Sequence, residues 1–161
     1  MKKILFAIAI IPVLLVFLVV TPFIVAPILN NITLSSFSKQ IYNYPLPKNS
    51  ELVEKKAVCG KLNGIGNGMD FFACILIKTD MSIDQLKQYY KEKEFKSAKN
   101  DKDHAANVEV TSINGEQLST DYVLHEDVRF SKLKNINDYS GYYAVMIYDG
   151  GYSADFDIRG H

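Results

Sequence analysis

The first 29 residues of this 161-residue chain carry only two charges, at Lys2 and Lys3, and residues 4–29 carry none. Of those 26 uncharged residues, 22 are apolar. A bilayer needs about 20 such residues in a helix, whereas the apolar core of a cleavable signal peptide has about 7–15. The absence of charge therefore predicts an uncleaved signal anchor at residues 1–29, which contacts the lipid bilayer through residues 4–29. Lys2 and Lys3 favour a cytoplasmic N-terminus, which places the remaining residues in an extracytoplasmic domain at the cell membrane.

Several other features are missing from this anchor. It has no ionisable residue within residues 4–29, which excludes a channel or transporter pathway, and no glycine-based face for tight helix pairing. No lipid-attachment cysteine follows it. We expect Pro12, Pro22 and Pro27 to bend or end the helix, because each removes an amide donor. The segment is thus expected to be an anchor and nothing more.

The other 132 residues have no large excess of either charge, because they hold 16 basic and 18 acidic side chains. This balance excludes the broad basic field of a non-specific nucleic-acid-binding protein. Hydrophobic residues and ten tyrosines are spread through this part, which opposes disorder. Its length suits one domain with its own core.

Residues 30–48 connect the anchor to that domain, which we expect at residues 49–161. Ile32, Phe37 and Ile41 recur at helical spacing and predict a juxtamembrane helix. Pro45 and Pro47 then stop the helix and predict an extended connector, because a residue before proline is pushed out of the helical region.

Cysteine is scarce, with only Cys59 and Cys74 in the chain. They lie in two strand-like runs, residues 52–62 and 69–78, and the second run is apolar on both faces, as in a covered central strand. If the cysteines lie opposite each other, the turn falls at Gly66 and Asn67, and a leading glycine suits a type II′ hairpin turn. This register favours a Cys59–Cys74 disulfide in an oxidising exterior. Two free, buried thiols are the alternative.

The remaining pattern predicts one main helix and several strands. Ser82 and Gln85 have the spacing of a capping box, and we expect the helix to end near Phe95. Strands are predicted at residues 108–113 and 122–130, with a terminal hairpin of residues 142–148 and 152–158. The fold class is α+β: an N-terminal transmembrane helix followed by a small, largely antiparallel sheet domain with one main helix.

Motifs for catalysis and for cofactors are absent. There is no GxSxG nucleophile motif, and the glycines of residues 64–68 lack the GxGxxG and GK[ST] patterns of phosphate-binding loops. Residues 101–104 fail the calcium-loop pattern. We therefore assign no catalytic residue, metal or cofactor, and interpret His125 and the group Asp155, Asp157 and Arg159 as solvated or ion-paired surface.

Tyrosines near the C-terminus are the best candidates for a binding surface, because each combines a large apolar ring with a polar tip. They are Tyr139, Tyr142, Tyr143, Tyr148 and Tyr152. Such a surface would suit an envelope protein or a carbohydrate. Tyrosine is also a common strand residue, and that is the alternative interpretation.

The stretch NYPLPKNSELVEKKAVCGKLNGIGNGMDFFACILIKTDMSIDQLKQYY resembles a group of short, membrane-anchored bacterial proteins without an assigned activity. The resemblance implies a location in the bacterial cell envelope. Together with the anchor and the missing catalytic motifs, it favours a single-pass, membrane-anchored binding or interaction module rather than an enzyme. Two alternatives stay open: a small envelope hydrolase that uses Asp, His and Glu groups such as Asp155 and His125, and an accessory subunit of a membrane complex.

Overall fold

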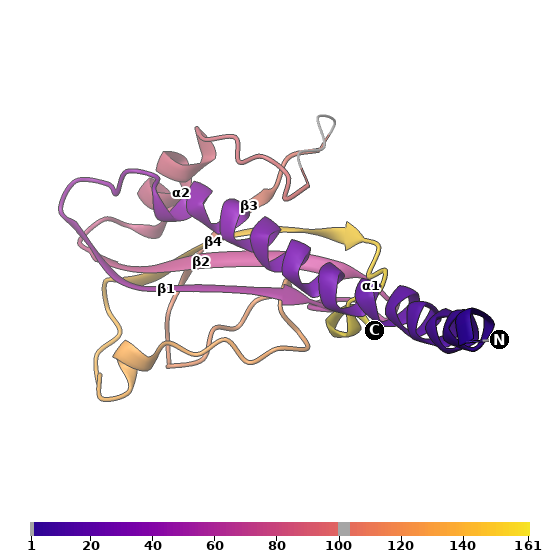
Figure 1. The fold of residues 1–161 in the computed structure, drawn as a ribbon. Coiled ribbons are helices and arrows are strands. Elements are labelled where there is room, and N and C mark those ends of the chain that lie inside the picture. The colour runs from indigo at the N-terminus through magenta and orange to yellow at the C-terminus, as the bar shows by residue number, and fades with distance from the viewer. Residues whose placement is uncertain (1, 100–103) are drawn as a thin grey trace.

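The computed structural model describes residues 2–99 and 104–161. Its elements are α1 (Lys2–Tyr42), β1 (Ser50–Gly60), β2 (Met69–Thr79), α2 (Ile83–Lys91), β3 (Asn107–Ser112), the 3-10 helix η1 (Ser131–Leu133), β4 (Tyr142–Tyr152) and the 3-10 helix η2 (Ile158–Gly160). Within the described residues, four strands form one antiparallel sheet in the order β1-β2-β4-β3 (Figure 1). The α+β class predicted from the sequence is confirmed.

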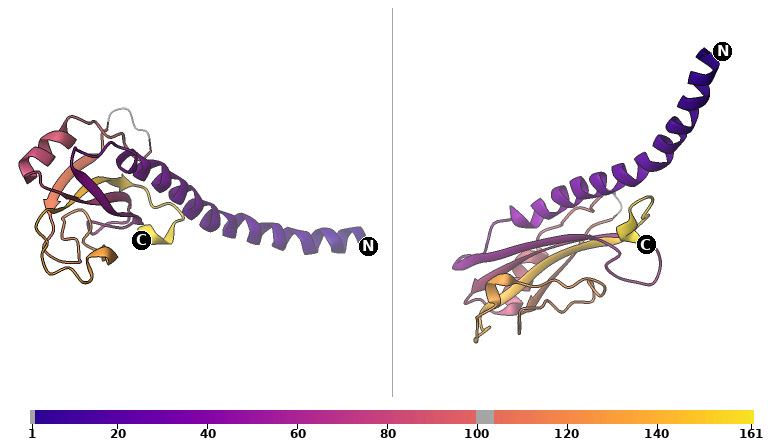
Figure 2. Two further views of the ribbon diagram at one scale, coloured as in Figure 1. Left: turned by 90° about the vertical axis from the view of Figure 1, so that its left-hand side faces the viewer. Right: turned by 60° about the horizontal axis from the view of Figure 1, so that its bottom comes forward.

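The first helix, α1, is continuous over 41 residues, so the apolar run and the juxtamembrane helix are one element. At 1.5 Å per residue it is about 60 Å long. Pro12, Pro22 and Pro27 do not end it, although its N-terminal half curves away from the domain (Figure 2). Residues Leu14–Tyr42 are long and apolar enough to cross a membrane, a property that membrane anchors share with signal sequences.

The last turns of α1 pack against the sheet. Phe37 and Ile41 are buried in a cluster that includes Phe71 and Ile75 of β2. Ile32 was expected on the same stripe but is 61% exposed. The buried stripe instead follows residues 30, 34, 37 and 41, and a residue two positions from Asn30 points to the opposite side of a helix.

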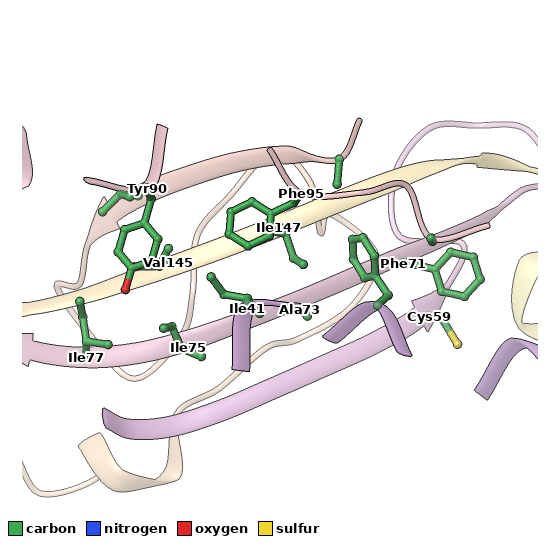
Figure 3. Packing of buried hydrophobic residues seen from close by; sticks show 14 of the residues in the cluster. Ile41, Cys59, Phe71, Ala73, Ile75, Ile77, Tyr90, Phe95, Val145 and Ile147 are labelled. Atoms are coloured by element: carbon green, nitrogen blue, oxygen red, sulfur yellow. The ribbon is translucent and has the colours of Figure 1, made fainter. Parts of the chain in front are cut away.

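The central strand β2 is buried on both faces, as its sequence predicts. Phe71, Ala73 and Ile75 pack under α1 and α2, in the cluster shown in Figure 3, which we call the helix-side cluster. Phe72 and Cys74 face a second cluster, which we call the loop-side cluster. Residues from the irregular segment 113–139 complete it. The sheet therefore lies between a layer of helices and a layer of loops (Figure 2).

The second helix confirms its predicted start. The Ser82 side chain accepts a hydrogen bond from the Gln85 backbone, and the Gln85 side chain accepts one from the Ser82 backbone. The helix ends at Lys91, four residues before the expected Phe95. Phe95 is buried in the helix-side cluster without being helical, so its apolar character reflects packing and not helix periodicity.

The predicted terminal hairpin is wrong. One strand, β4, runs through the expected turn, because Gly150 and Gly151 form an irregularity in the β2–β4 ladder instead of reversing the chain. Glycines serve such bulges as readily as turns. The chain leaves the sheet after Tyr152, and η2 replaces the second expected strand. Residues 122–130 likewise form no strand, and an isolated bridge joins Gln117 to Arg129.

The predicted disulfide is also wrong, because Cys59 and Cys74 are both free. The observed register pairs Cys59 with Phe71 and Cys74 with Lys56, three residues from the expected pairing. An odd shift moves one side chain to the other face of a sheet, so Cys59 lies in the helix-side cluster and Cys74 in the loop-side cluster.

The connection between β1 and β2 explains this register. It is an eight-residue loop, residues 61–68, in place of a two-residue turn. The backbone amides of Lys61 and Gly68 donate hydrogen bonds to the carbonyls of Arg159 and Gly160. The C-terminal segment therefore occupies the space between the two strand ends that a tight turn would close.

Candidate functional site at the exit end of the domain

Three buried carboxylates gather at one end of the sheet. This is the end at which β1 stops, β2 starts and β4 stops, and from which the N-terminal part of α1 leaves the domain; we call it the exit end (Figure 1). Asp70, Asp149 and Asp157 are buried there, and no other Asp or Glu of the described residues is. A buried charge is costly unless it is paired, so the partners of each carboxylate define its role.

Asp70 binds backbone amides. Its Oδ2 accepts hydrogen bonds from the amides of Leu62 and Asn63 at 3.1 and 3.2 Å, and its Oδ1 accepts one from Gly151 at 2.9 Å. Burial and the adjacent Asp70 raise the pKa of Tyr148 above its ordinary range. Gly150 is required here, because a Cβ at this position would collide with the Asp70 carboxylate. Asp70 thus joins the β1–β2 loop to the irregular end of β4.

Asp149 is fully buried and lies beside an imidazole at the surface. Its Oδ2 accepts a hydrogen bond from the Ala98 amide at 2.6 Å and one from the Tyr152 hydroxyl, while its Oδ1 lies 2.9 Å from Nε2 of His104. The His104 side chain is 49% exposed. Burial and the bond to Asp149 raise the pKa of Tyr152 to about 12, which keeps its hydroxyl protonated as a donor.

This arrangement has part of what general-base catalysis needs. A carboxylate that holds one ring nitrogen of a histidine fixes its tautomer and leaves the other nitrogen to accept a proton. The neighbouring Ser97 hydrogen-bonds to the Tyr152 hydroxyl, but Ser97 is itself buried. Nε2 of His104 is at ion-pair distance from Asp149 Oδ1, but this oxygen accepts no hydrogen bond from the described residues, so the pair meets only the distance part of the requirement. Asp149 was not predicted as a site residue, because Asp149, Gly150 and Gly151 resemble a turn in the sequence.

The residues suggested for a hydrolase do not join this pair. Nε2 of His125 lies 2.8 Å from the Gly64 carbonyl, in the loop between β1 and β2. Asp155 is exposed and accepts a hydrogen bond from the Ser153 hydroxyl at 2.6 Å. Asp101 and Asp103 of the calcium-like sequence lie outside the described residues. Among the described residues, no group of three or more His, Cys, Asp or Glu side chains is arranged to hold a metal ion.

Asp157 and Arg159 form the third cluster. The Arg159 guanidinium donates to both carboxylate oxygens of Asp157, from Nη2 at 2.7 Å and from Nε at 3.0 Å. These bonds, with one from Asn30, lower the pKa of Asp157 to about 2, against the effect of burial. Arg159 also donates to Asn31 Oδ1 at 2.8 Å. The expected ion pair is present, but it does not lie on the outer face of a strand. It attaches residues 153–161, here called the C-terminal strap, to α1.

The five tyrosines proposed as a binding surface do not share a face. Tyr139, Tyr142 and Tyr148 pack with the loop-side cluster, whereas Tyr143 and Tyr152 pack with the helix-side cluster. All five are buried or partly buried. Successive strand residues point to opposite sides of a sheet, which separates Tyr143 from Tyr142 and Tyr148. Tyr152 has the same parity as Tyr148 but packs on the helix side, because the irregularity at Gly150 and Gly151 adds one residue to β4. The structure gives these tyrosines no common exposed surface.

Comparison of the chain with protein-family models, with curated proteins and with solved structures finds no match.

The side of α1 that faces away from the sheet offers the remaining candidate surface. Ile28 and Ile32 are exposed there, one turn apart. They lie in a shallow groove of about 430 Å³ whose lining residues are Ile28, Asn31, Ile32, Ser35, Ser36 and Lys39. We call this surface the outer face of α1. It continues the exposed apolar surface of the N-terminal half of the helix, where Phe23 and Ile24 are also exposed.

Proposed function

We propose that this chain is a single-pass membrane protein whose small α+β domain lies outside the bacterial cytoplasm and acts as an interaction module. One observation carries the proposal: α1 passes from an uncharged apolar run into the core of the domain without a linker. A soluble protein would not gain from an apolar helix that extends, exposed, beyond its core. A membrane anchor built in this way holds the domain at a fixed place on the bilayer surface.

The outer face of α1 is the proposed partner surface, and a second membrane-spanning helix is the proposed partner. Helices approach closely where small side chains alternate with apolar ones, and Ser35 and Ser36 follow Ile28 and Ile32 on this face. Because the face is continuous with the exposed apolar half of α1, one partner helix can contact both. The module would then serve as an accessory subunit of a membrane complex.

Two matched serine variants test the location and the partner. Ser35 lies on the outer face of α1, and Ser119 is an exposed residue of the loop layer. The native thiols give little background, because Cys59 and Cys74 are buried and burial raises the pKa of Cys74 to about 12. We expect a membrane-impermeant maleimide to label Ser119→Cys in intact cells. Labelling that requires lysis would place the domain in the cytoplasm and refute the proposal.

The same variants, modified with a thiol-specific photo-crosslinker in native membranes, test the partner surface. We expect Ser35→Cys to form an adduct with one membrane protein, Ser119→Cys to form none, and the additional change Ile32→Lys to abolish the adduct. Equal adducts from both serine positions, or none from Ser35→Cys, would show that the outer face of α1 is not the partner surface.

A hydrolase is the second candidate, because Nε2 of the exposed His104 lies 2.9 Å from the buried Asp149 carboxylate. The purified full-length protein in detergent would be assayed with fluorogenic ester and peptide substrates. Hydrolysis that is lost in His104→Ala and retained in His125→Ala would establish this candidate and displace the interaction module. Absence of hydrolysis, or hydrolysis that survives His104→Ala, would eliminate it.

A further inference from the structure

Within the C-terminal strap, Asp157 and Arg159 turn toward the domain and α1, whereas Phe156 and Ile158 turn outward. Asp157 is fully buried, and Arg159 folds back onto Asp157 and α1. Phe156, which precedes Asp157, is 48% exposed, and Ile158, which lies between Asp157 and Arg159, is 74% exposed. A surface segment in water normally shows the opposite arrangement. Outward apolar residues beside satisfied polar ones are what contact with a non-aqueous surface requires.

The strap lies beside the last part of the uncharged run of α1. The Phe156 ring packs edge-on against the ring of Phe23, with centroids 5.2 Å apart. Arg159 donates to the Pro27 carbonyl at 3.3 Å and to Asn31. Figure 1 shows the C-terminal segment next to α1 where the helix leaves the domain. Phe156 and Ile158 are therefore attached to a defined level of α1.

Helix length relates that level to a bilayer. The uncharged run of 26 residues is about 39 Å long, which exceeds a hydrocarbon core of about 30 Å. If Lys2 and Lys3 stay among the cytoplasmic headgroups, the hydrocarbon ends about 20 residues later, near Phe23. Phe23 is the residue that Phe156 contacts.

We propose that Phe156 and Ile158 lie in the outer interface of the bilayer, so that the strap is a second lipid contact beside the anchor. This inference rests on the proposed membrane location of α1. The exposed charge of Asp155 keeps the strap at the level of the headgroups, above the hydrocarbon centre. Hydrogen bonds from Arg159 and Asn30 satisfy the Asp157 carboxylate, so the strap brings no unpaired buried charge to the interface.

The chain has no tryptophan, so single substitutions provide a clean fluorescent probe. Full-length Ile158→Trp and Phe156→Trp would be reconstituted into two sets of phosphatidylcholine vesicles, whose acyl chains carry bromine either near the headgroups or deep in the chains. Two reference variants complete the set: Leu14→Trp in the exposed apolar part of α1, and Leu52→Trp at the far end of β1. The measurement is the loss of fluorescence relative to vesicles without bromine.

We expect bromine near the headgroups to quench Ile158→Trp and Phe156→Trp, bromine deep in the chains to quench Leu14→Trp, and neither to quench Leu52→Trp. Bromine placed near the headgroups should quench Ile158→Trp more than bromine placed deep in the chains. Quenching of Leu14→Trp without quenching of Ile158→Trp and Phe156→Trp would overturn the lipid contact of the strap while the anchor stands. Absence of quenching at Leu14→Trp would overturn the anchor itself.

Discussion

The side-chain amide of Asn30 donates a 2.9 Å hydrogen bond to the buried carboxylate of Asp157, across 127 residues of sequence. Asn30 lies one residue beyond the uncharged run, and Asp157 lies in the C-terminal strap. The bond therefore joins the helix that leaves the domain to the segment that lies between the ends of β1 and β2. Loss of the Asp157 charge should weaken the attachment of the C-terminal strap to α1 and to the ends of β1 and β2.

Asp157→Asn is expected to lower the free energy of unfolding by about 2 kcal/mol, because it removes one partner of a buried, doubly hydrogen-bonded ion pair whose arginine is partly exposed. Urea unfolding of the full chain in detergent measures the change. Asp155→Asn is the matched control, since Asp155 is exposed two residues away and asparagine tolerates its positive φ. Equal effects of the two variants would show that the ion pair adds nothing.

The pH dependence of stability should follow the same carboxylate. Hydrogen bonds from Arg159 lower the pKa of Asp157 from 3.8 to about 2 in the folded state, so the folded protein binds the proton less tightly than the unfolded chain. The stabilisation is complete above about pH 4 and is lost as the pH falls through 2. It amounts to about 1–2 kcal/mol after allowance for the exposure of Arg159. The unfolding free energies of the wild type and Asp157→Asn should converge between pH 4 and pH 2; a constant difference would contradict the assignment.

Both thiols should be slow to react in the folded protein and reactive without reductant in denaturant. Burial raises the pKa of Cys59 and of Cys74, and only the thiolate reacts with maleimide. Gel-shift labelling of protein purified without reductant should therefore show two added groups after denaturation. Labelling that depends on prior reduction would restore the disulfide and require a different β1–β2 register.

Gly150→Ala should destabilise the domain by about 2–3 kcal/mol, because the added Cβ would meet the Asp70 carboxylate and the Tyr148 ring. Gly115→Ala is the control: a Cβ there meets nothing within 4 Å, so its effect should stay within about 0.5 kcal/mol. Thermal unfolding of the two variants in parallel measures the difference. Similar melting temperatures would mean that the exit end can relax around the methyl group.

Patterns that depend on near neighbours were predictable from the sequence. The double-sided burial of β2 follows from its unbroken apolar run, and the start of α2 follows from Ser82 and Gln85. The exposed apolar half of α1 follows in the same way from its missing charges. Each of these signals lies within a few residues of the element that it predicts.

Pairings between distant segments were not predictable. The Cys59–Cys74 register looked consistent because Gly66 and Asn67 suit a turn, yet the backbones of Arg159 and Gly160 hold the loop open from almost 100 residues away. Gly150 and Gly151 resemble a turn in sequence, and only the carboxylate of Asp70, from another strand, shows why a glycine is needed in a bulge. The His104–Asp149 pair was hidden for the same reason.

Every residue from Lys2 to Tyr42 is helical, and the last turns of that helix are part of the core. A helix that is too long for its membrane responds by tilting. In the proposed membrane location, α1 has no flexible joint between the bilayer and the core, so that a tilt of α1 becomes a rotation of the whole domain. Membrane thickness would then determine the orientation of the domain, and with it which surfaces of the domain face neighbouring molecules.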